Sequence, residues 1–191
     1  SYVLVVEGAI PTQGGGKYCY VWDEGGRAVT MAEAVQSLAA TAQHVVAVGA
    51  CASFGGIPAK YAPTGAVGLG AFLGRSVVNL PGCPAHPDWI VGSLVQLLSG
   101  QTPALDGNGR PRAYYPSESI HERCPREDWD DDERDGVSSS DDSGVSFGIA
   151  GACLEELGCK GKRTHADCDV RGWNNGQGYC IGVNGLCIGC T

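Results

Sequence analysis

The sequence lacks a long apolar run and an excess of basic residues. No apolar stretch approaches the roughly 18 to 20 residues that are needed to span a bilayer. The chain has 13 Lys and Arg against 21 Asp and Glu, which gives a formal net charge of −8. Phosphate binding requires clustered Lys and Arg, so we expect no nucleic-acid partner.

The chain also lacks an initiator methionine and a charged-then-apolar leader. It opens directly on the stretch SYVLVVEG, which has the pattern of a buried strand. We therefore expect the complete protein to have residues before Ser1. With no signal or transmembrane segment in these residues, the location stays open between cytoplasmic and membrane-associated.

The negative charge is concentrated in one segment. Residues 127–142 contain nine acidic residues and one basic residue, whereas the rest of the chain contains twelve of each. A segment of this kind is typical of a solvated surface loop. A docking surface for a basic partner is the alternative.

Apolar runs and helical patterns alternate in the first half of the chain. The patterns predict strands at 2–6, 45–48 and 76–80, and helices at 31–43 and 87–98. Thr30 and Glu33 form a capping-box pattern, and Pro87 suits a first helical position. This order predicts an α/β fold with a parallel sheet. The regular pattern fades after Gly100, which predicts a loop-rich region with one short helix at 152–157.

Two cysteines follow predicted strands. Cys51 lies in the loop GACASFGG after the second strand, and Cys83 lies in the loop PGCP after the third. Ligands of parallel α/β sheets bind at the carboxyl ends of the strands. The two thiols are therefore candidates for one shared site, with two buried, inert cysteines as the alternative.

Seven of the ten cysteines lie between His121 and Cys190. Disulfides are one interpretation, but a chain of 191 residues with an α/β core needs no such crosslinks. Structural zinc is the second, because Cys187-x-x-Cys190 resembles a zinc knuckle. Iron–sulfur clusters fit better, since they accept thiolates from irregularly spaced loops and tolerate histidine ligation. The spacing alone does not exclude zinc.

Six motifs then occur in a fixed order along the chain. They are VVEGAIP, GACASFGG, NLPGCPAHP, HERCP, CLEELGCKG and CIGC, and they extend from Val5 to Cys190. The ordered set resembles the small subunit of [NiFe] hydrogenases. The resemblance implies a flavodoxin-like α/β domain at 1–105, with the proximal cluster, and a loop-rich domain at 106–191 with the distal and medial clusters.

The resemblance also assigns the metal ligands by motif. Cys51 and Cys83 would be proximal ligands in an incomplete set, because no N-terminal CxxC is present. The distal [4Fe–4S] cluster would take His121, Cys124, Cys153 and Cys159. The medial cluster, [3Fe–4S] or [4Fe–4S], would take Cys168, Cys187 and Cys190. Cys180 is either a fourth medial ligand or a bystander, and Cys19 matches no ligand motif.

No catalytic residue is expected on this chain itself. The resemblance implies that H2 is oxidised at a Ni–Fe centre in a large partner subunit, and that electrons pass through this chain to a cytochrome, a quinone or a soluble carrier. It is also compatible with higher oligomers of such heterodimers. The alternatives are a zinc-binding structural module without a redox role and the iron–sulfur subunit of a related quinone reductase. Residues 121–190 argue against the second of these, because a quinone reductase subunit lacks the corresponding region.

Overall fold

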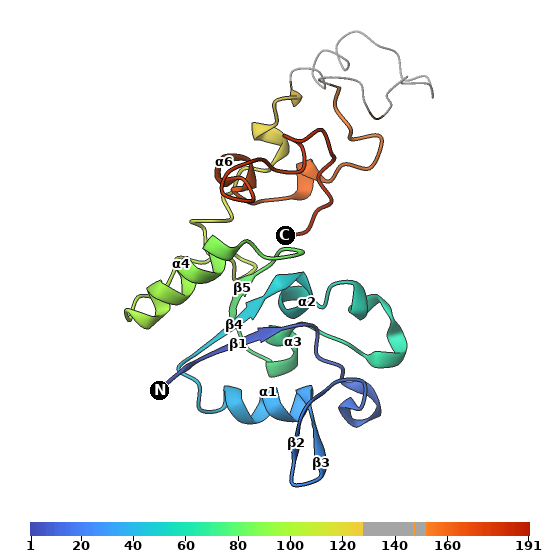
Figure 1. Cartoon of the computed structure of the whole chain (residues 1–191), viewed down its shortest axis with the longest axis vertical. Coiled ribbons are helices and arrows are strands. Elements are labelled where there is room, and N and C mark those ends of the chain that lie inside the picture. Colours follow the sequence, from blue (N-terminus) through green and yellow to red (C-terminus); the bar gives the residue numbers. More distant parts are fainter. Residues whose placement is uncertain (128–146, 148–151) are drawn as a thin grey trace. The chain divides into compact units, whose positions relative to one another are not determined.

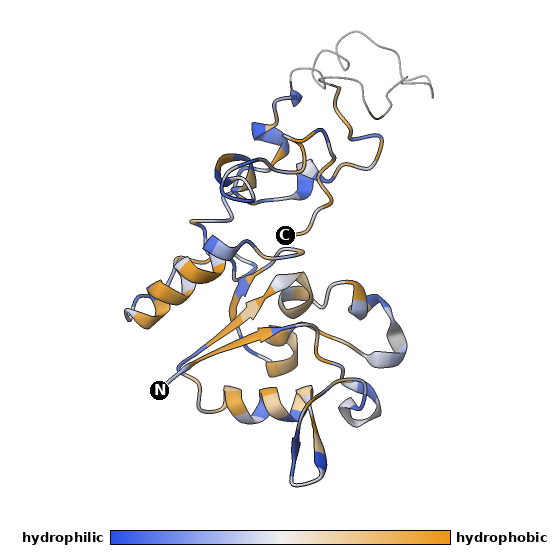
Figure 2. Cartoon of the chain, viewed as in Figure 1, coloured by the Kyte–Doolittle hydropathy of each residue, from blue (hydrophilic) through white to orange (hydrophobic). Residues whose placement is uncertain are grey.

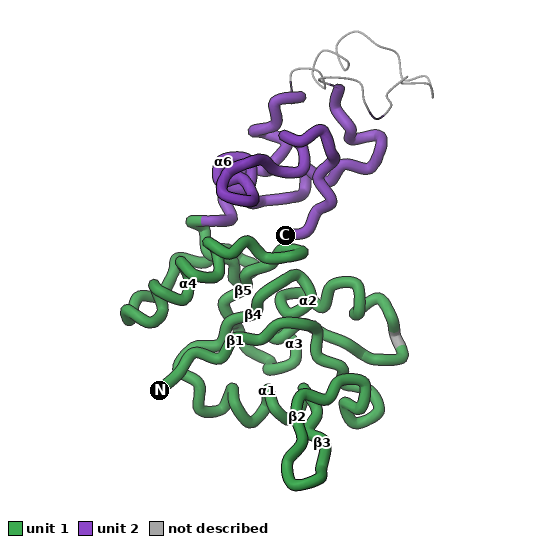
Figure 3. The backbone as a smooth tube through the Cα atoms, viewed as in Figure 1, with its two compact units in different colours: residues 1–113 green, residues 114–191 purple. Residues whose placement is uncertain are grey.

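The computed structural model describes residues 1–127, 147 and 152–191. Most of the acidic segment at 127–142 therefore lies outside the described residues, and its expected role as a surface loop stays a prediction. The chain divides into two compact units, Ser1–Ala113 and Tyr114–Thr191, which Figure 3 shows in green and purple.

The boundary between the units lies eight residues beyond the one expected after residue 105. Hydrogen bonds hold the turn at 106–110 to the sheet of the first unit. The Asn79 amide donates to the Gly109 carbonyl at 2.8 Å, and the Asn79 side chain donates to the Asn108 carbonyl at 2.7 Å. This turn therefore belongs to the α/β unit.

Unit 1 is built on a three-stranded parallel sheet with the order β1-β4-β5 (Figure 1). The strands are β1 (Val3–Glu7), β4 (His44–Val48) and β5 (Val78–Leu80). Their apolar, β-branched residues suit a sheet covered on both faces, and Figure 2 shows β1 and β4 in the hydrophobic colours. The parallel α/β fold expected from the sequence is confirmed.

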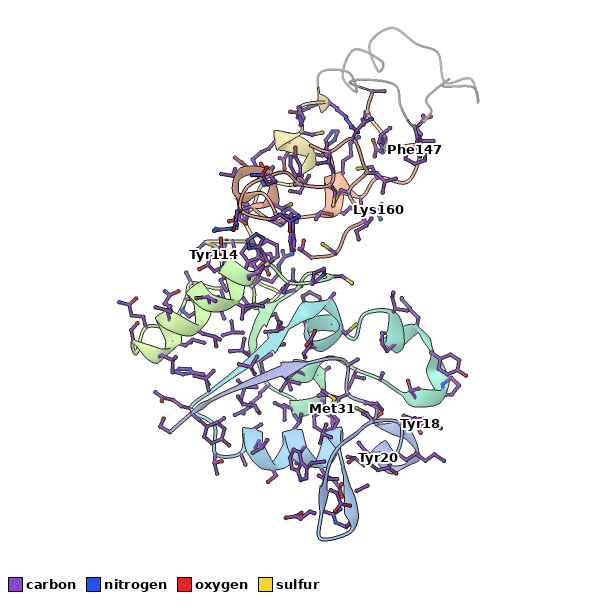
Figure 4. All side chains as sticks on the ribbon, viewed as in Figure 1. Tyr18, Tyr20, Met31, Tyr114, Phe147 and Lys160 are labelled. Atoms are coloured by element: carbon purple, nitrogen blue, oxygen red, sulfur yellow. The ribbon has the colours of Figure 1, made fainter. Side chains whose placement is uncertain are left out.

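Helices cover both faces of this sheet. In Figure 1, α1 (Met31–Ala39) and α4 (Pro87–Leu98) lie on opposite sides of it. Two shorter helices, α2 (Gly49–Phe54) and α3 (Leu69–Leu73), also pack against the strands. Buried side chains of α1, such as Met31 (labelled in Figure 4) and Val35, share one core with Val45 and Ala47 of β4.

The start of α1 and the extent of α4 agree with the patterns that predict them. The Thr30 hydroxyl accepts the Glu33 amide at 3.2 Å, and the Glu33 carboxylate accepts the Thr30 amide at 2.9 Å, so the capping box is present. The helix ends at Ala39 rather than at residue 43. Beyond this end, the amides of Thr41 and Ala42 both donate to the Leu38 carbonyl, and the Gln43 amide donates to the Tyr2 carbonyl at 2.9 Å.

One element of unit 1 was not expected. Strands β2 (Tyr20–Glu24) and β3 (Arg27–Thr30) form an antiparallel hairpin, whose aromatic residue Tyr20 is labelled in Figure 4. Gly25 and Gly26 connect them with positive φ angles of 61° and 87°, as two-residue hairpin turns require. Unit 1 also contains the 3₁₀ helices η1 (Gln13–Gly16), η2 (Ile57–Lys60) and η3 (Ala62–Thr64).

The described part of unit 2 is mostly loops, as the sequence predicts. Its regular elements are η4 (His121–Arg123), η5 (Gly161–Arg163) and α6 (Cys168–Arg171). The expectation of a short helix at 152–157 is wrong. Tight turns form instead, because the amides of Leu157 and Gly158 donate to carbonyls three residues back. Among the described residues, no helix is both long and apolar enough to cross a membrane.

A buried ion pair closes the turn at 106–110, and we expect its removal to weaken unit 1. The Asp106 carboxylate accepts the amides of Asn108 and Arg110 and binds Arg110 Nε at 2.8 Å. Burial alone would raise the pKa of Asp106, but the hydrogen bonds from Arg110 outweigh it and lower the pKa below its ordinary value of 3.8. Asp106→Asn should cost about 2 kcal/mol near neutral pH.

The stabilisation that this ion pair contributes should depend on pH. Because the folded pKa is depressed, the stabilisation is complete above pH 3.8 and is lost as the pH falls through the lower, folded value. The difference between wild type and Asp106→Asn in urea unfolding should therefore shrink in acid. Asp23→Asn, at an exposed carboxylate, serves as the control. A difference that stays constant with pH would contradict the assignment.

Candidate metal centres

Cys51 and Cys83 emerge from neighbouring strands at the same edge of the sheet. Val48 of β4 and Leu80 of β5 are register partners, and each cysteine follows its partner residue by three positions. The Ala50 amide donates to the Gly82 carbonyl at 2.9 Å and joins the two connections. The structure therefore brings both thiols to the carboxyl edge of the parallel sheet.

The local backbone at Cys51 differs from the expected loop. Cys51 lies on the short helix α2, which follows β4 directly. Gly56 returns so close to this helix that a Cβ atom would lie 2.6 Å from Cys51 Sγ, and its φ is +54°. Only glycine fits this position. Cys83 is exposed in the turn that follows β5.

In unit 2, three of the four expected distal ligands lie near one another. Cys124 follows η4, which begins at His121. The Cβ position of Gly161 lies 3.6 Å from both Cys159 Sγ and His121 Cβ, so these two residues flank one glycine. Burial raises the pKa of the Cys124 thiol, and the neighbouring thiol of Cys159 adds to the rise. Cys153 is buried with an exposed fraction of 7%.

The expected medial ligands form a second group. Cys168 begins α6, and its thiol has a pKa raised to about 12, first by burial and then by the negative field of nearby groups that include Cys187, Cys190 and Cys180. Cys187 is itself buried, and its Sγ donates to Thr164 Oγ1 at 3.4 Å. Thiols raise one another's pKa when they lie close together, because neighbouring thiolates repel each other. A bound cation would relieve this repulsion when they ionise.

One apolar centre connects the two groups. Ile120, Ile181 and Cys187 form a buried cluster, and the partly buried residues packed against it are Cys124, Cys159, Cys168 and Tyr179. The Cys187 amide also donates to Cys159 Sγ at 3.3 Å, so a residue of one group binds the sulfur of the other. The adjacent Lys160, labelled in Figure 4, donates its amide to the Cys187 carbonyl at 2.8 Å.

The chemistry of these residues fits iron–sulfur clusters. All ten cysteines are free thiols, and the sulfurs of Cys124 and Cys159 accept backbone amides, which is how proteins tune cluster potentials. The shared core buries Cys187 and partly buries Cys124, Cys159 and Cys168. Within the described residues, no three His, Cys, Asp or Glu side chains converge on one point as ligands of a single ion would.

Two arginines of this region were not singled out by sequence reasoning. Arg123 binds Asp169 through both oxygens, at 2.8 and 2.9 Å, and also donates to the Ala166 carbonyl. Arg126 donates its amide to Cys124 Sγ at 3.4 Å and buries its guanidinium. Both lie in the segment HERCPR, but the side chains that they bind at 2.8 Å are 46 and 58 residues away in the sequence, so no local pattern predicts their roles.

An α/β unit with two thiols at the carboxyl edge of its sheet, followed by a cysteine-rich loop unit, defines a class of two-part redox proteins. Family models agree with this division. Residues 1–97 match the model "NADH ubiquinone oxidoreductase, 20 Kd subunit". Residues 116–191 match the C-terminal model of the "NiFe/NiFeSe hydrogenase small subunit", which favours a hydrogenase over a quinone reductase.

The chain belongs to the family of NiFe and NiFeSe hydrogenase small subunits. It is 41% identical to the periplasmic [NiFeSe] hydrogenase small subunit of Desulfomicrobium baculatum, with all of this chain and 63% of the relative covered. It is 36% identical to the F420 non-reducing hydrogenase II small subunit of Methanosarcina mazei, covering 53% of that protein. The chain thus spans between about half and two thirds of the length of these relatives.

Solved structures show the same fold. The reduced, active [NiFeSe] hydrogenase of Desulfomicrobium baculatum matches with a TM-score of 0.84 and 40% identity over all of this chain and 70% of that one. The oxidised [NiFeSe] hydrogenase of Desulfovibrio vulgaris Hildenborough also has a TM-score of 0.84, at 38% identity over 98% of this chain and 69% of that one. The expected flavodoxin-like domain with a loop-rich region is confirmed.

Proposed function

We propose that this chain relays electrons within a [NiFe]-type hydrogenase. In this proposal H2 is oxidised to two protons and two electrons at a Ni–Fe centre in a large partner subunit. The chain carries the electrons toward an external acceptor, a cytochrome, a quinone or a soluble carrier. The observation that supports it most is the packing of four unit 2 cysteines, Cys124, Cys159, Cys168 and Cys187, in one apolar cluster.

The ligand assignment follows the motifs, and the contacts support most of it. The proposed ligands are His121, Cys124, Cys153 and Cys159 for a distal [4Fe–4S] cluster, Cys168, Cys187 and Cys190 for a medial cluster, and Cys51 and Cys83 as two ligands of a proximal cluster. Iron–sulfur clusters held there would accept and donate single electrons. The thiols of Cys124 and Cys159 lie close enough to affect each other electrostatically, as do those of Cys168 and Cys187, and these pairings agree with the two proposed ligand sets.

The chain's own residues would hold and tune these centres. Ile120 and Ile181 exclude water from the region between the two thiol groups, which lowers the local dielectric. The amides of Arg126 and Cys187 donate to thiolate sulfurs and so favour the more negative, reduced state. His121 would be a neutral ligand in place of a thiolate, which would make the distal centre less negative and raise its potential.

Metal analysis of the purified holoprotein, in complex with its partner subunit, tests the proposal. Unit 2 should account for about seven to eight irons, with matching acid-labile sulfide and cluster EPR signals in oxidised or reduced protein. His121→Ala should change the distal signal alone, with His44→Ala on β4 as the matched control. Zinc in place of iron would refute the relay and support a structural zinc module.

We further propose that Cys180 is the fourth ligand of a medial [4Fe–4S] cluster. Its thiol is exposed, and it adds to the negative field that raises the pKa of the Cys168 thiol. The Gly185 amide donates to the Cys180 carbonyl at 2.8 Å and holds this turn beside Cys187. A thiol in this position favours four iron ligands over three.

Cys180→Ala is expected to convert the medial centre into a three-iron cluster. The holoprotein should lose about one iron and gain the EPR signal of an oxidised [3Fe–4S] cluster, because three thiolates retain three irons. Cys19→Ala is the control, since that thiol packs against Met31 in unit 1. Unchanged iron content and spectra in Cys180→Ala would make Cys180 a bystander.

A further inference from the structure

Arg126 is a buried cation whose side chain binds only neutral acceptors among the described residues. The residue is 8% exposed. Its guanidinium donates to Asn184 Oδ1 at 2.8 Å, to the Ile181 carbonyl at 3.3 Å and to the Gly185 carbonyl at 3.4 Å. Within the described part of the chain, no carboxylate forms an ion pair with it. A buried charge without a counter-charge costs several kcal/mol, so an anionic partner is expected nearby.

Arg123, three residues earlier in the chain, differs from Arg126 in its partners. Arg123 is neutralised by a two-pronged ion pair with Asp169. The positive charge of Arg126 has no such balance in the residues that the structure describes, although it is the more buried of the two. Among the described residues, Arg126 therefore carries a buried charge that no ion pair balances, whereas the charge of Arg123 is paired.

Arg126 lies beside the cysteines of unit 2. Its amide donates to Cys124 Sγ at 3.4 Å, so its backbone lies directly beside a proposed distal ligand. Its guanidinium is fixed by the turn at 181–185, which follows Cys180 and precedes Cys187. Asn184 in this turn has a positive φ of 67°, and its side-chain oxygen is aimed at the guanidinium.

We propose that Arg126 is a positioning residue that sets the reduction potential of the distal centre by acting as its fixed internal counter-charge. A cluster gains negative charge on reduction, so a buried cation beside one of its ligands stabilises the reduced state and raises the potential. The same guanidinium ties the Cys124 segment to the turn between Cys180 and Cys187. The inference rests on the proposed electron relay. It gives a role to Arg126, a residue that lies outside the six family motifs.

Redox titration of the holoprotein, followed by EPR, tests this assignment. Arg126→Gln removes the charge and keeps a hydrogen-bonding side chain. Its distal centre should show a reduction equilibrium constant about tenfold lower, equivalent to about 59 mV for one electron. Arg126→Lys, which keeps the charge, should stay close to wild type. Arg163→Gln on η5 removes an exposed, solvent-screened charge and should change little.

Each outcome decides the question. An unshifted potential in Arg126→Gln, or equal shifts in Arg126→Gln and Arg126→Lys, would overturn the proposal. If Arg126→Gln loses iron, Arg126→Lys decides: restored iron and potential support the counter-charge, and continued loss overturns it. Wild-type protein without iron–sulfur signals would instead refute the relay itself, so the two failures are distinct.

Discussion

Cys187→Ala is expected to abolish the medial centre and to destabilise unit 2 as a whole. Cys187 has two roles, because its thiol is a proposed ligand and its side chain is 8% exposed within the apolar cluster of Ile120 and Ile181. The holoprotein should lose about three to four irons. Since metal binding adds directly to folding free energy, the apparent stability of unit 2 should fall by several kcal/mol.

Two comparisons separate the ligand role from the packing role. Cys19→Ala removes a half-buried thiol from the core of unit 1, and should cost about 1 kcal/mol without loss of iron. After iron is removed by chelation, wild type and Cys187→Ala should differ by a similar small amount, since only packing then distinguishes them. Full iron content and unchanged spectra in Cys187→Ala would exclude Cys187 as a ligand.

The fold of unit 1 could largely be predicted because its signals are local. The Thr30–Glu33 capping box, Pro87 at the start of α4 and the apolar runs each fix an element by short-range chemistry. The hairpin at 20–30 was missed, although Gly25-Gly26 is a turn signal, because its strands are short and exposed. The turn after α1 is followed by a hydrogen bond from Gln43 to Tyr2, a residue far away in the sequence, which no local pattern contains.

In the candidate site too, the features that local patterns determine could be predicted, and those that depend on distant residues could not. Cys51 and Cys83 could be placed at one sheet edge because parallel strands fix the relation between their ends. The grouping of Cys168 with Cys187 follows the motifs but not the spacing, because irregular loops bring them together. The roles of Arg123 and Arg126 depend on partners 46 and 55 or more residues away, so no sequence pattern reveals them.

The ion pair of Arg123 and Asp169 should be the strongest polar link in unit 2. Arg123 adjoins Cys124, and Asp169 adjoins Cys168, so the pair fastens a proposed distal segment to a proposed medial one. Both carboxylate oxygens accept from Arg123, and the side chains are only 20% and 9% exposed. The hydrogen bonds to Asp169 hold the pKa of Arg123 above its ordinary value. Asp169→Ala should destabilise unit 2 by about 3 kcal/mol, because it removes the two-pronged partner of a largely buried guanidinium and leaves only the more exposed Glu118 carboxylate, 3.7 Å away.

A double-mutant cycle with Arg123→Met and Asp169→Ala isolates this link. We expect a coupling energy of about 2 kcal/mol in denaturant unfolding, and EPR changes at both proposed centres in either single variant. Asp167→Ala is the matched control, because Asp167 pairs with Arg171 only one turn along the same helix. That local pair should contribute less than about 1 kcal/mol.

Additive effects in the cycle, with EPR changes at one centre only, would mean that the ion pair does not join the two segments. Coupled effects would instead identify Arg123 and Asp169 as the residues that fix the spacing between the two centres, on which the rate of electron transfer between them depends.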